Sequence, residues 1–165
     1  MLAKDGKCYT FVVPSLHIIY ASTSGHTEYV IEKLVAFLKG ANAALSIETQ
    51  RVELTKPEDL VRGDVLLLAS GTWNTGSIEG QLNPHMHDFL KVRAKAIDLK
   101  GKPVALIALG DERYRYTCGS LTHLEEFVHG HGGVILGDSL RIMNEPYGQE
   151  AAVESWGKNL LPLLK

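Results

Sequence analysis

Four short apolar runs recur along the chain at intervals that suit alternating strands and helices. Each is rich in aliphatic or β-branched side chains, and they cover residues 17–22, 64–70, 103–109 and 133–137. Because both faces of each run are apolar, they are typical of strands in the middle of a parallel sheet. A fifth segment, residues 46–54, alternates polar and apolar side chains and predicts an edge strand.

Between these runs, apolar residues recur at helical spacing. The first such stripe contains Tyr29, Val30 and Leu34 and ends near Lys39-Gly40, as helices commonly do. Three more helices are predicted, over residues 84–95, with Met86, Phe89, Leu90 and Val92 on the apolar stripe, and over residues 121–130 and 150–164, the last interrupted by Pro162. Strands that alternate with helices predict an α/β three-layer sandwich with a five-stranded parallel sheet and helices on both faces.

The domain organisation follows from the same pattern. Residues 17–165 form one predicted domain, and 165 residues are enough to bury a sizeable core. Residues 1–16 lie outside the pattern and read as an N-terminal extension of unknown role, in which residues 9–13 form either a short added strand or part of an arm.

Composition excludes several classes of function. The formal net charge is −2 and the basic residues are scattered, which argues against nucleic-acid binding. No apolar run approaches the length of a membrane span. Two cysteines, Cys8 and Cys118, do not form a disulfide framework, so we expect a cytoplasmic protein. The histidine pairs 85/87 and 129/131 have a spacing that does not align on one helix face, so no metal site is expected.

The loop after the first strand is rich in hydroxyl groups and opens a helix. Free N–H groups and the helix dipole make such a position suitable for a phosphate. Ser22, Ser24 and Thr27 supply hydroxyls, while Gly25 lets the backbone approach an anion. The loop lacks the lysine of a P-loop and the three glycines of a dinucleotide site. The alternative is an ordinary helix start capped by Ser24 or Thr27.

Two further loops carry aromatic residues among polar neighbours. Trp73 lies in residues 70–76, and Tyr114 and Tyr116 lie in residues 110–119. Open parallel sheets bind ligands beyond the carboxyl ends of their strands, where all three loops are expected to meet. Two aromatic loops around an anion site suit a flat conjugated molecule with a phosphate. Taken singly, Trp73 could instead cap the sheet, and either tyrosine could be half-buried packing.

Four motifs in order resemble those of short-chain flavodoxins, across about residues 17–160. They are residues 22–29, 72–74, 110–119 and 137–142. The resemblance implies the flavodoxin-like strand order 2-1-3-4-5, with no long insertion in the fifth strand. Flavodoxin is itself the standard illustration of ligand binding where the winding reverses, so that placement comes with the resemblance.

The resemblance also implies a noncovalent FMN site. Its phosphate would contact Ser22, Thr23, Ser24, Gly25, His26 and Thr27, where His26 stands in place of the family's frequent Asn and predicts pH-sensitive binding. Trp73 and Tyr114 would flank the ring. The backbone near Asp111 and Cys118 would meet the pyrimidine edge, beside Tyr116. The remaining implied contacts are Gly71, Thr72, Asn74, Thr75, Gly76, Leu109, Gly110 and Thr117.

The implied function is low-potential one-electron transfer, cycling FMN between semiquinone and hydroquinone. The donor would be a flavodoxin/ferredoxin reductase-type protein and the acceptor a redox enzyme, with this chain a monomer that needs no catalytic residue. Asn74 follows Trp73 where related proteins turn a peptide on reduction, a turn that asks for a positive φ and favours the neutral semiquinone.

The chain departs from the family in its charge. Flavodoxins are usually strongly acidic around the flavin, whereas Glu79 is the only carboxylate between Trp73 and Gly80, and Arg113 and Arg115 offset the carboxylates of their own loop. Fewer carboxylates predict a less negative potential for the second electron and a partner with a mixed or less basic surface.

Two alternative functions remain on the same fold. One is an FMN-dependent NAD(P)H:quinone or azo reductase, which would need a substrate pocket above the ring. The other is a regulatory module that has lost its flavin, or a domain of a larger diflavin reductase. Fold alone does not separate these alternatives, because function belongs to the site.

Overall fold

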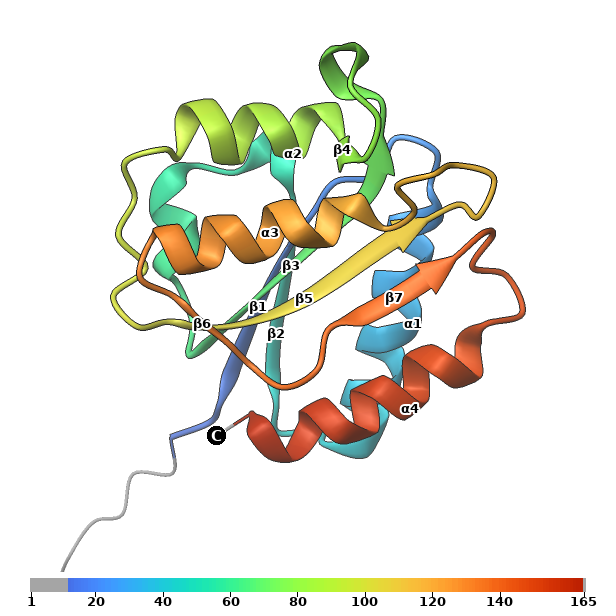
Figure 1. Cartoon of the computed structure of the whole chain (residues 1–165). Helices are drawn as coiled ribbons and strands as arrows, with labels where there is room; N and C mark the ends of the chain where they lie inside the picture. Colours follow the sequence, from blue (N-terminus) through green and yellow to red (C-terminus); the bar gives the residue numbers. More distant parts are fainter. Residues whose placement is uncertain (1–11, 165) are drawn as a thin grey trace, which may run out of the picture.

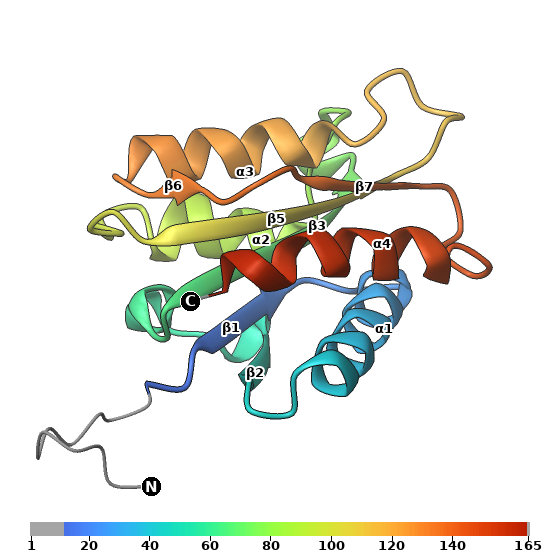
Figure 2. The same ribbon diagram turned by 90° about the horizontal axis from the view of Figure 1, so that it is seen from below.

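The computed structural model describes residues 12–164, which form a central sheet between two helical layers. The parallel strands run in the order β2-β1-β3-β5-β6, and β7 also pairs with β5. Figures 1 and 2 show α1 and α4 on one face of the sheet and α2 and α3 on the other. The predicted three-layer sandwich and its strand order are confirmed. The main elements are β1 (Ser15–Tyr20), α1 (His26–Ala41), β2 (Ser46–Arg51), β3 (Val65–Trp73), α2 (Pro84–Asp88), β5 (Pro103–Gly110), α3 (Gly119–Gly130), β6 (Val134–Ile135), β7 (Leu140–Met143) and α4 (Glu150–Leu160).

The apolar runs are continuous because the two faces of the sheet feed two separate cores. Ile18 and its neighbour on β3, Leu67, face α1 and α4. The next residues along the same strands, Ile19 and Leu68, pack against Phe89 and the α3 side. Side chains alternate between faces along a strand, so a strand buried on both sides must be apolar at every position.

The fifth strand is interrupted, which corrects the prediction of one strand over residues 133–137. Ile135 pairs with Val104 and Leu140 pairs with Ile107, so three steps along β5 correspond to five along the last strand. The two extra residues push the chain out of the sheet between β6 and β7. The carbonyl of Asp138 in this break accepts a hydrogen bond from Trp156 Nε1 at 2.6 Å.

A short hairpin at the end of β3 is absent from the prediction. β3 continues to Trp73, beyond the predicted end at residue 70, and β4 (Gln81–Leu82) returns antiparallel to it. This hairpin holds the segment from residue 74 to residue 80 above the sheet end. Its turn contains the 3₁₀ helix η3 (Thr75–Ser77).

Several boundaries also differ from the predictions. β1 begins at Ser15 rather than at residue 17, and β2 gives way at Val52 to the 3₁₀ helices η1 (Val52–Leu54) and η2 (Pro57–Val61). The helix predicted over residues 84–95 changes at Phe89 into the π-helical turn η4 (Phe89–Arg93), which leaves Val92 exposed instead of in the core. The last helix ends at Leu160 and continues as η5 (Leu161–Leu163), which contains Pro162. The sequence left open whether residues 9–13 form a short strand or part of an arm. Most of these residues lie outside the part of the chain that the structure describes.

Candidate functional site

A cavity of about 390 Å³ lies at the carboxyl ends of β1, β3 and β5. In Figure 1 the ends of β3 and β5 and the start of α1 lie at the same end of the sheet. The winding reverses here, since β1 has β2 on one side and β3 on the other. The volume falls within the range of small-molecule sites, about 300–1,000 Å³. The cavity is lined by residues of the loop after β1, the hairpin after β3, the loop after β5 and the segment after β7.

One end of the cavity is polar and rich in hydrogen-bond donors. Gly25 precedes α1 with φ of 88°, a left-handed conformation that glycine adopts without strain. The N–H groups of His26 and Thr27 are the first two of the helix, and helix geometry gives them no intrahelical acceptor. The hydroxyls of Ser24 and Thr27 line the same end. Ser22 acts differently, because its buried Oγ accepts the N–H of Glu28 at 3.1 Å.

Buried Asn83, the cap residue of α2, supports the loop between β1 and α1. Asn83 Nδ2 donates to Thr23 Oγ1 at 2.9 Å, and its Oδ1 accepts the N–H of His85 at 3.0 Å as the cap of α2. Its own N–H donates to Ser70 Oγ at 3.1 Å. The sequence signal for the cap is Asn83-Pro84 at the start of a helical pattern. Nothing in that signal indicates the second contact, with Thr23.

An arginine from the edge strand also holds the loop. Arg51 Nη2 donates to the carbonyl of Ser22 at 2.6 Å, and its Nη1 lies 3.2 Å from Glu28 Oε1. Tyr20 donates its hydroxyl to the same carboxylate oxygen at 2.8 Å. Burial and, next, this bond to Glu28 raise the pKa of Tyr20 to about 12. β1, β2 and α1 therefore share one hydrogen-bonded network beneath the polar end of the cavity.

The other end of the cavity has two large aromatic side chains. Trp73 stands at the end of β3 with 38% of its surface exposed, and Tyr114 is 51% exposed on the loop after β5. Both line the cavity. The indole lies against Gly71, where an added Cβ would come within 3.2 Å of Trp73 Nε1.

The strand end behind the indole is fixed by hydroxyl groups. Thr72 Oγ1 donates to the carbonyl of Leu109 at 2.8 Å and accepts the N–H of Ser120 at 3.2 Å. Ser120 Oγ in turn donates to the carbonyl of Ser70 at 3.2 Å. These bonds join β3, β5 and the first turn of α3. The strand that carries Trp73 therefore has little freedom to shift.

The two aromatic loops are joined to each other. The carboxylate of Glu79 accepts the N–H of Arg115 at 2.8 Å. Gly80 lies so close to Tyr116 that an added Cβ would come within 2.7 Å of the tyrosine Cβ. Gly119 is equally close to the carbonyl of Gly80, at 2.6 Å from its ideal Cβ position. The two loops form one continuous wall.

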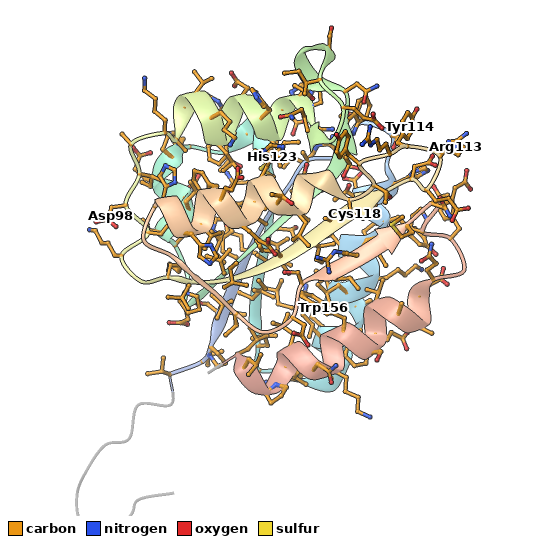
Figure 3. The ribbon with its side chains drawn as sticks, viewed as in Figure 1. Asp98, Arg113, Tyr114, Cys118, His123 and Trp156 are labelled. Carbon is orange, nitrogen blue, oxygen red and sulfur yellow. The ribbon has the colours of Figure 1, made fainter. Side chains whose placement is uncertain are left out.

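Cys118 closes the base of the loop after β5 rather than facing the cavity. Its side chain is buried, its φ is 52°, and its Sγ lies 3.4 Å from Met143 Sδ. Figure 3 shows it between α3 and β7, away from Arg113 and Tyr114. Burial raises the pKa of the thiol, which keeps it protonated and weakly nucleophilic. The geometry therefore favours a packing role over a redox role.

The charges around the cavity are of mixed sign. Arg113 hydrogen-bonds Asp111 through its Nε, at 2.9 and 3.0 Å from the two carboxylate oxygens, and through its backbone N–H. These hydrogen bonds from Arg113 lower the pKa of Asp111 to about 2. Glu145, which follows β7, also lines the cavity, and no sequence motif pointed to it. Gly80, Asn83 and Asn144 line it without having been predicted either, whereas Glu79 and Arg113 were expected near the ring only as charges.

Most of the residues singled out from the sequence come together around this cavity. Those that line it are Thr23, Ser24, His26, Thr27, Gly71, Thr72, Trp73, Asn74, Leu109, Gly110, Asp111, Tyr114, Tyr116 and Thr117. Five of the residues singled out do not line it. They are Ser22, Gly25, Thr75, Gly76 and Cys118. Thr75 is engaged within the hairpin, where its Oγ1 donates to the carbonyl of Leu82 at 2.6 Å.

The turn after Trp73 has its left-handed residues beyond Asn74, and the positive φ expected of Asn74 on reduction stays a prediction. Asn74 has φ of −91°, not a positive value. The left-handed residues are Gly76, with φ of 67°, and Ser77, with φ of 62°. The hairpin reverses direction at these two positions, so Asn74 needs no left-handed conformation here.

Comparison with known proteins agrees with this architecture. The family model described as Flavodoxin matches residues 18–156. The chain belongs to the flavodoxin family. It is 34% identical over 146 residues to the flavodoxin of Maridesulfovibrio salexigens, an alignment that covers 87% of this chain and 94% of that protein. It is 31% identical over 149 residues to the flavodoxin of Nitratidesulfovibrio vulgaris, covering 89% and 97% of the two chains.

Solved flavodoxin structures share the fold. Oxidised flavodoxin 1 of Bacillus cereus superposes with a TM-score of 0.79 at 22% identity, over 92% of this chain and 99% of that one. Members of the flavodoxin family are electron-transfer flavoproteins, so membership implies a flavin cofactor, typically FMN. Among residues 12–164, no helix has both the length and the apolar character needed to cross a membrane.

Proposed function

We propose that this protein is a one-electron carrier that binds FMN noncovalently in the cavity at the carboxyl ends of β1, β3 and β5. The observation that supports this most is that two kinds of group line one cavity. They are the donor-rich start of α1 and the aromatic side chains of Trp73 and Tyr114. This is the donor set that a phosphate and a flat conjugated ring require.

The residues of the polar end suit a phosphate without a metal or a lysine. Ser24, Thr27 and the free N–H groups of α1 would bind it, and the helix dipole would stabilise its charge. Thr23 is held in place by Asn83. Arg51 and Asn83 already hold this loop in place before a ligand binds. Binding therefore costs less conformational entropy than it would with a flexible loop.

The aromatic end would hold the ring and restrict access to it. Trp73 and Tyr114 would flank the ring from two different loops, and the backbone near Asp111 would meet its polar edge. Bound flavin supplies the electron chemistry, while the protein sets binding, orientation and electrostatics. A carrier of this kind needs no general acid or base. Coverage by two aromatic side chains leaves less room for the stacked nicotinamide or quinone that a reductase requires.

Electrons would pass at the exposed edge of this site, from a reductase-type donor to a redox enzyme in the cytoplasm. The flavin would alternate between its one-electron and two-electron reduced forms. The mixed charge around the rim, with Arg113 and Arg115 beside Asp111 and Glu112, favours partners that do not depend on a strongly basic docking face.

The experiment that tests this function is a stepwise reduction of the FMN-supplemented protein, with a visible absorption spectrum recorded at each step. We expect bound flavin in a stoichiometric complex and accumulation of the one-electron reduced form at intermediate potentials. A protein that takes up no FMN would contradict the proposal. Steady NAD(P)H–quinone turnover by the pure protein would contradict it in another way, in favour of a reductase.

A further inference from the structure

An aromatic cluster outside the flavin-flanking pair lies against the polar end of the cavity. The ring of Tyr147, in the segment between β7 and α4, is 4.8 Å from the ring of Tyr29 on α1. It also meets the ring of His26 edge-on, with 5.6 Å between centroids and an interplanar angle of 87°. Residues more than a hundred positions apart in sequence thus meet at the first turn of α1.

This cluster is anchored on both sides. Tyr29 donates its hydroxyl to the carboxylate of Glu150 at the start of α4, and that carboxylate also accepts the N–H of Gly148 at 3.2 Å. Gln149 Nε2 donates to the carbonyls of Met143 and Glu145 at 2.7 and 2.6 Å. The segment that carries Tyr147 is therefore held to its own ends and to α1.

His26 is the member of this cluster that faces the cavity. It is the first residue of α1 and lines the polar end beside Ser24 and Thr27. Residues 12–164 supply no hydrogen-bond partner for either of its ring nitrogens. Arg113, a cationic side chain on the cavity wall, already donates its hydrogen bonds to Asp111. His26 is thus a donor left available at the phosphate end.

We propose that Tyr147, held by Tyr29 and Glu150, is a positioning residue that orients the His26 ring to donate a hydrogen bond to the flavin phosphate. This inference rests on the proposed function. The edge contact restricts the ring of His26 to one side, so less rotamer freedom is lost when the phosphate binds. The consequence is selectivity, because the His26 donor stabilises bound FMN and contributes nothing to riboflavin, which lacks the phosphate.

The test measures the dissociation constants of FMN and riboflavin for the flavin-free protein by quenching of flavin fluorescence. Tyr147→Ala leaves the His26 donor in place but frees its ring, so it is expected to weaken FMN binding by about threefold, the scale of restricting one rotamer. His26→Ala, which removes the donor, should weaken it by about tenfold. Riboflavin binding should change by less than about twofold. Tyr147→Phe, which keeps the ring, should bind both flavins like the wild type. Leu54→Ala, at a side chain 76% exposed on η1, is the matched control for loss of surface apolar area.

A double-mutant cycle with His26→Ala completes the test. If Tyr147 acts through His26, adding Tyr147→Ala to His26→Ala should weaken FMN binding no further. Equal losses for FMN and riboflavin would overturn the inference, as would additive losses or a Tyr147→Phe variant as weak as Tyr147→Ala. If the wild-type protein binds FMN and the variants prefer FMN over riboflavin as strongly as the wild type does, only this inference fails. If the wild type binds neither flavin, the proposed function fails as well.

Discussion

Gly110 lies against the other end of its own loop, at Cys118, with no room for a side chain. An added Cβ on Gly110 would lie 2.4 Å from the nitrogen of Cys118 and 2.8 Å from its Sγ. Real Cβ atoms do not approach backbone that closely, so any larger residue would push the two ends of the loop apart. That loop carries Tyr114, which means that the absence of a side chain at Gly110 helps to place an aromatic wall of the cavity.

Gly110→Ala is therefore expected to weaken FMN binding and to lower the free energy of unfolding by about 1–3 kcal/mol, the usual cost of overpacking. Gly40→Ala is the matched control. Its Cβ would meet nothing within 4 Å in the last turn of α1, so a neutral or slightly stabilising effect is expected. Urea unfolding and FMN titration measure both effects. Equal behaviour of the two variants would show that the approach of Gly110 to Cys118 is not required.

The raised pKa of Tyr20 predicts a specific loss of stability at high pH. The folded protein keeps the phenol proton to about pH 12, whereas an unfolded chain releases it near the ordinary value of 10.0. Between these two values the folded state binds more protons, so stability falls as pH rises. The contribution is complete below pH 10 and lost by about pH 12. We expect Tyr20→Phe to lose less unfolding free energy than the wild type across this window in urea titrations, and parallel losses would contradict this.

At the scale of elements, the interrupted last strand brings α4 into contact with the sheet. The break between β6 and β7 exposes a backbone carbonyl, and the indole of Trp156 on α4 supplies the donor. Beyond the break, β7 pairs with the carboxyl end of β5, at Leu109 and Gly110. The segment after β7, which carries Tyr147, therefore starts at the level of the cavity.

Trp156→Phe would keep most of the apolar surface and remove the donor to Asp138. Asp138 is exposed, so water can reach its carbonyl, and the expected loss of stability is that of one ordinary hydrogen bond, about 0.5–1.5 kcal/mol. Val92→Ala, at a side chain 58% exposed on η4, should change stability by no more than about 0.5 kcal/mol. Urea unfolding measures both stability changes, as shifts of the midpoint at an unchanged dependence of the unfolding free energy on urea concentration. A Trp156→Phe variant as stable as the wild type would show that water replaces the indole.

At the scale of the whole molecule, charge distinguishes this chain from a strongly acidic electron carrier. The chain has nineteen acidic and seventeen basic residues, and Arg113 and Arg115 lie among the carboxylates of the loop after β5. A second electron added to a reduced flavin is repelled by nearby negative charge, and exposed charges act over about one Debye length, roughly 8–10 Å at physiological salt. Charges on the loop after β5, which lines the cavity, are close enough to a bound flavin to affect its second reduction potential. Charges at the amino ends of the strands are too far from it.

Two charge changes on that loop should therefore shift the second reduction potential in opposite directions. Glu112→Gln removes a negative charge and should make the potential less negative, while Arg115→Gln removes a positive charge and should make it more negative. Each shift is expected to be on the order of tens of millivolts. Potentiometric titration measures them. Lys100→Gln, just before the amino end of β5 and so at the other end of the sheet, is the control, and a shift of the same size there would contradict a local effect.

Much of the architecture could be predicted from local sequence, because its causes are local. Apolar side chains at successive positions, as in Ile18 and Ile19, report a strand covered on both faces. The hydroxyls and Gly25 before a helical stripe predict an anion-binding helix start, and aromatic residues among polar ones predict a loop that meets a ligand; the structure brings both kinds of loop to one cavity. The break within the last strand and the π turn at Phe89 were not predictable in this way, since both depend on how distant segments pack.

What the sequence by itself determined was the set of elements and the chemical character of each loop. The tertiary structure alone decided which loops meet and which side chains support them. Asn83 reads locally as a helix cap and Arg51 as an edge-strand residue, yet both bond to the loop that opens α1. Tyr147 shows no pattern of its own, and its contact with His26 exists because the segment after β7 leads into α4, which packs against α1. The physical reason is that a contact between residues far apart in sequence depends on strand order and register, which no single segment encodes.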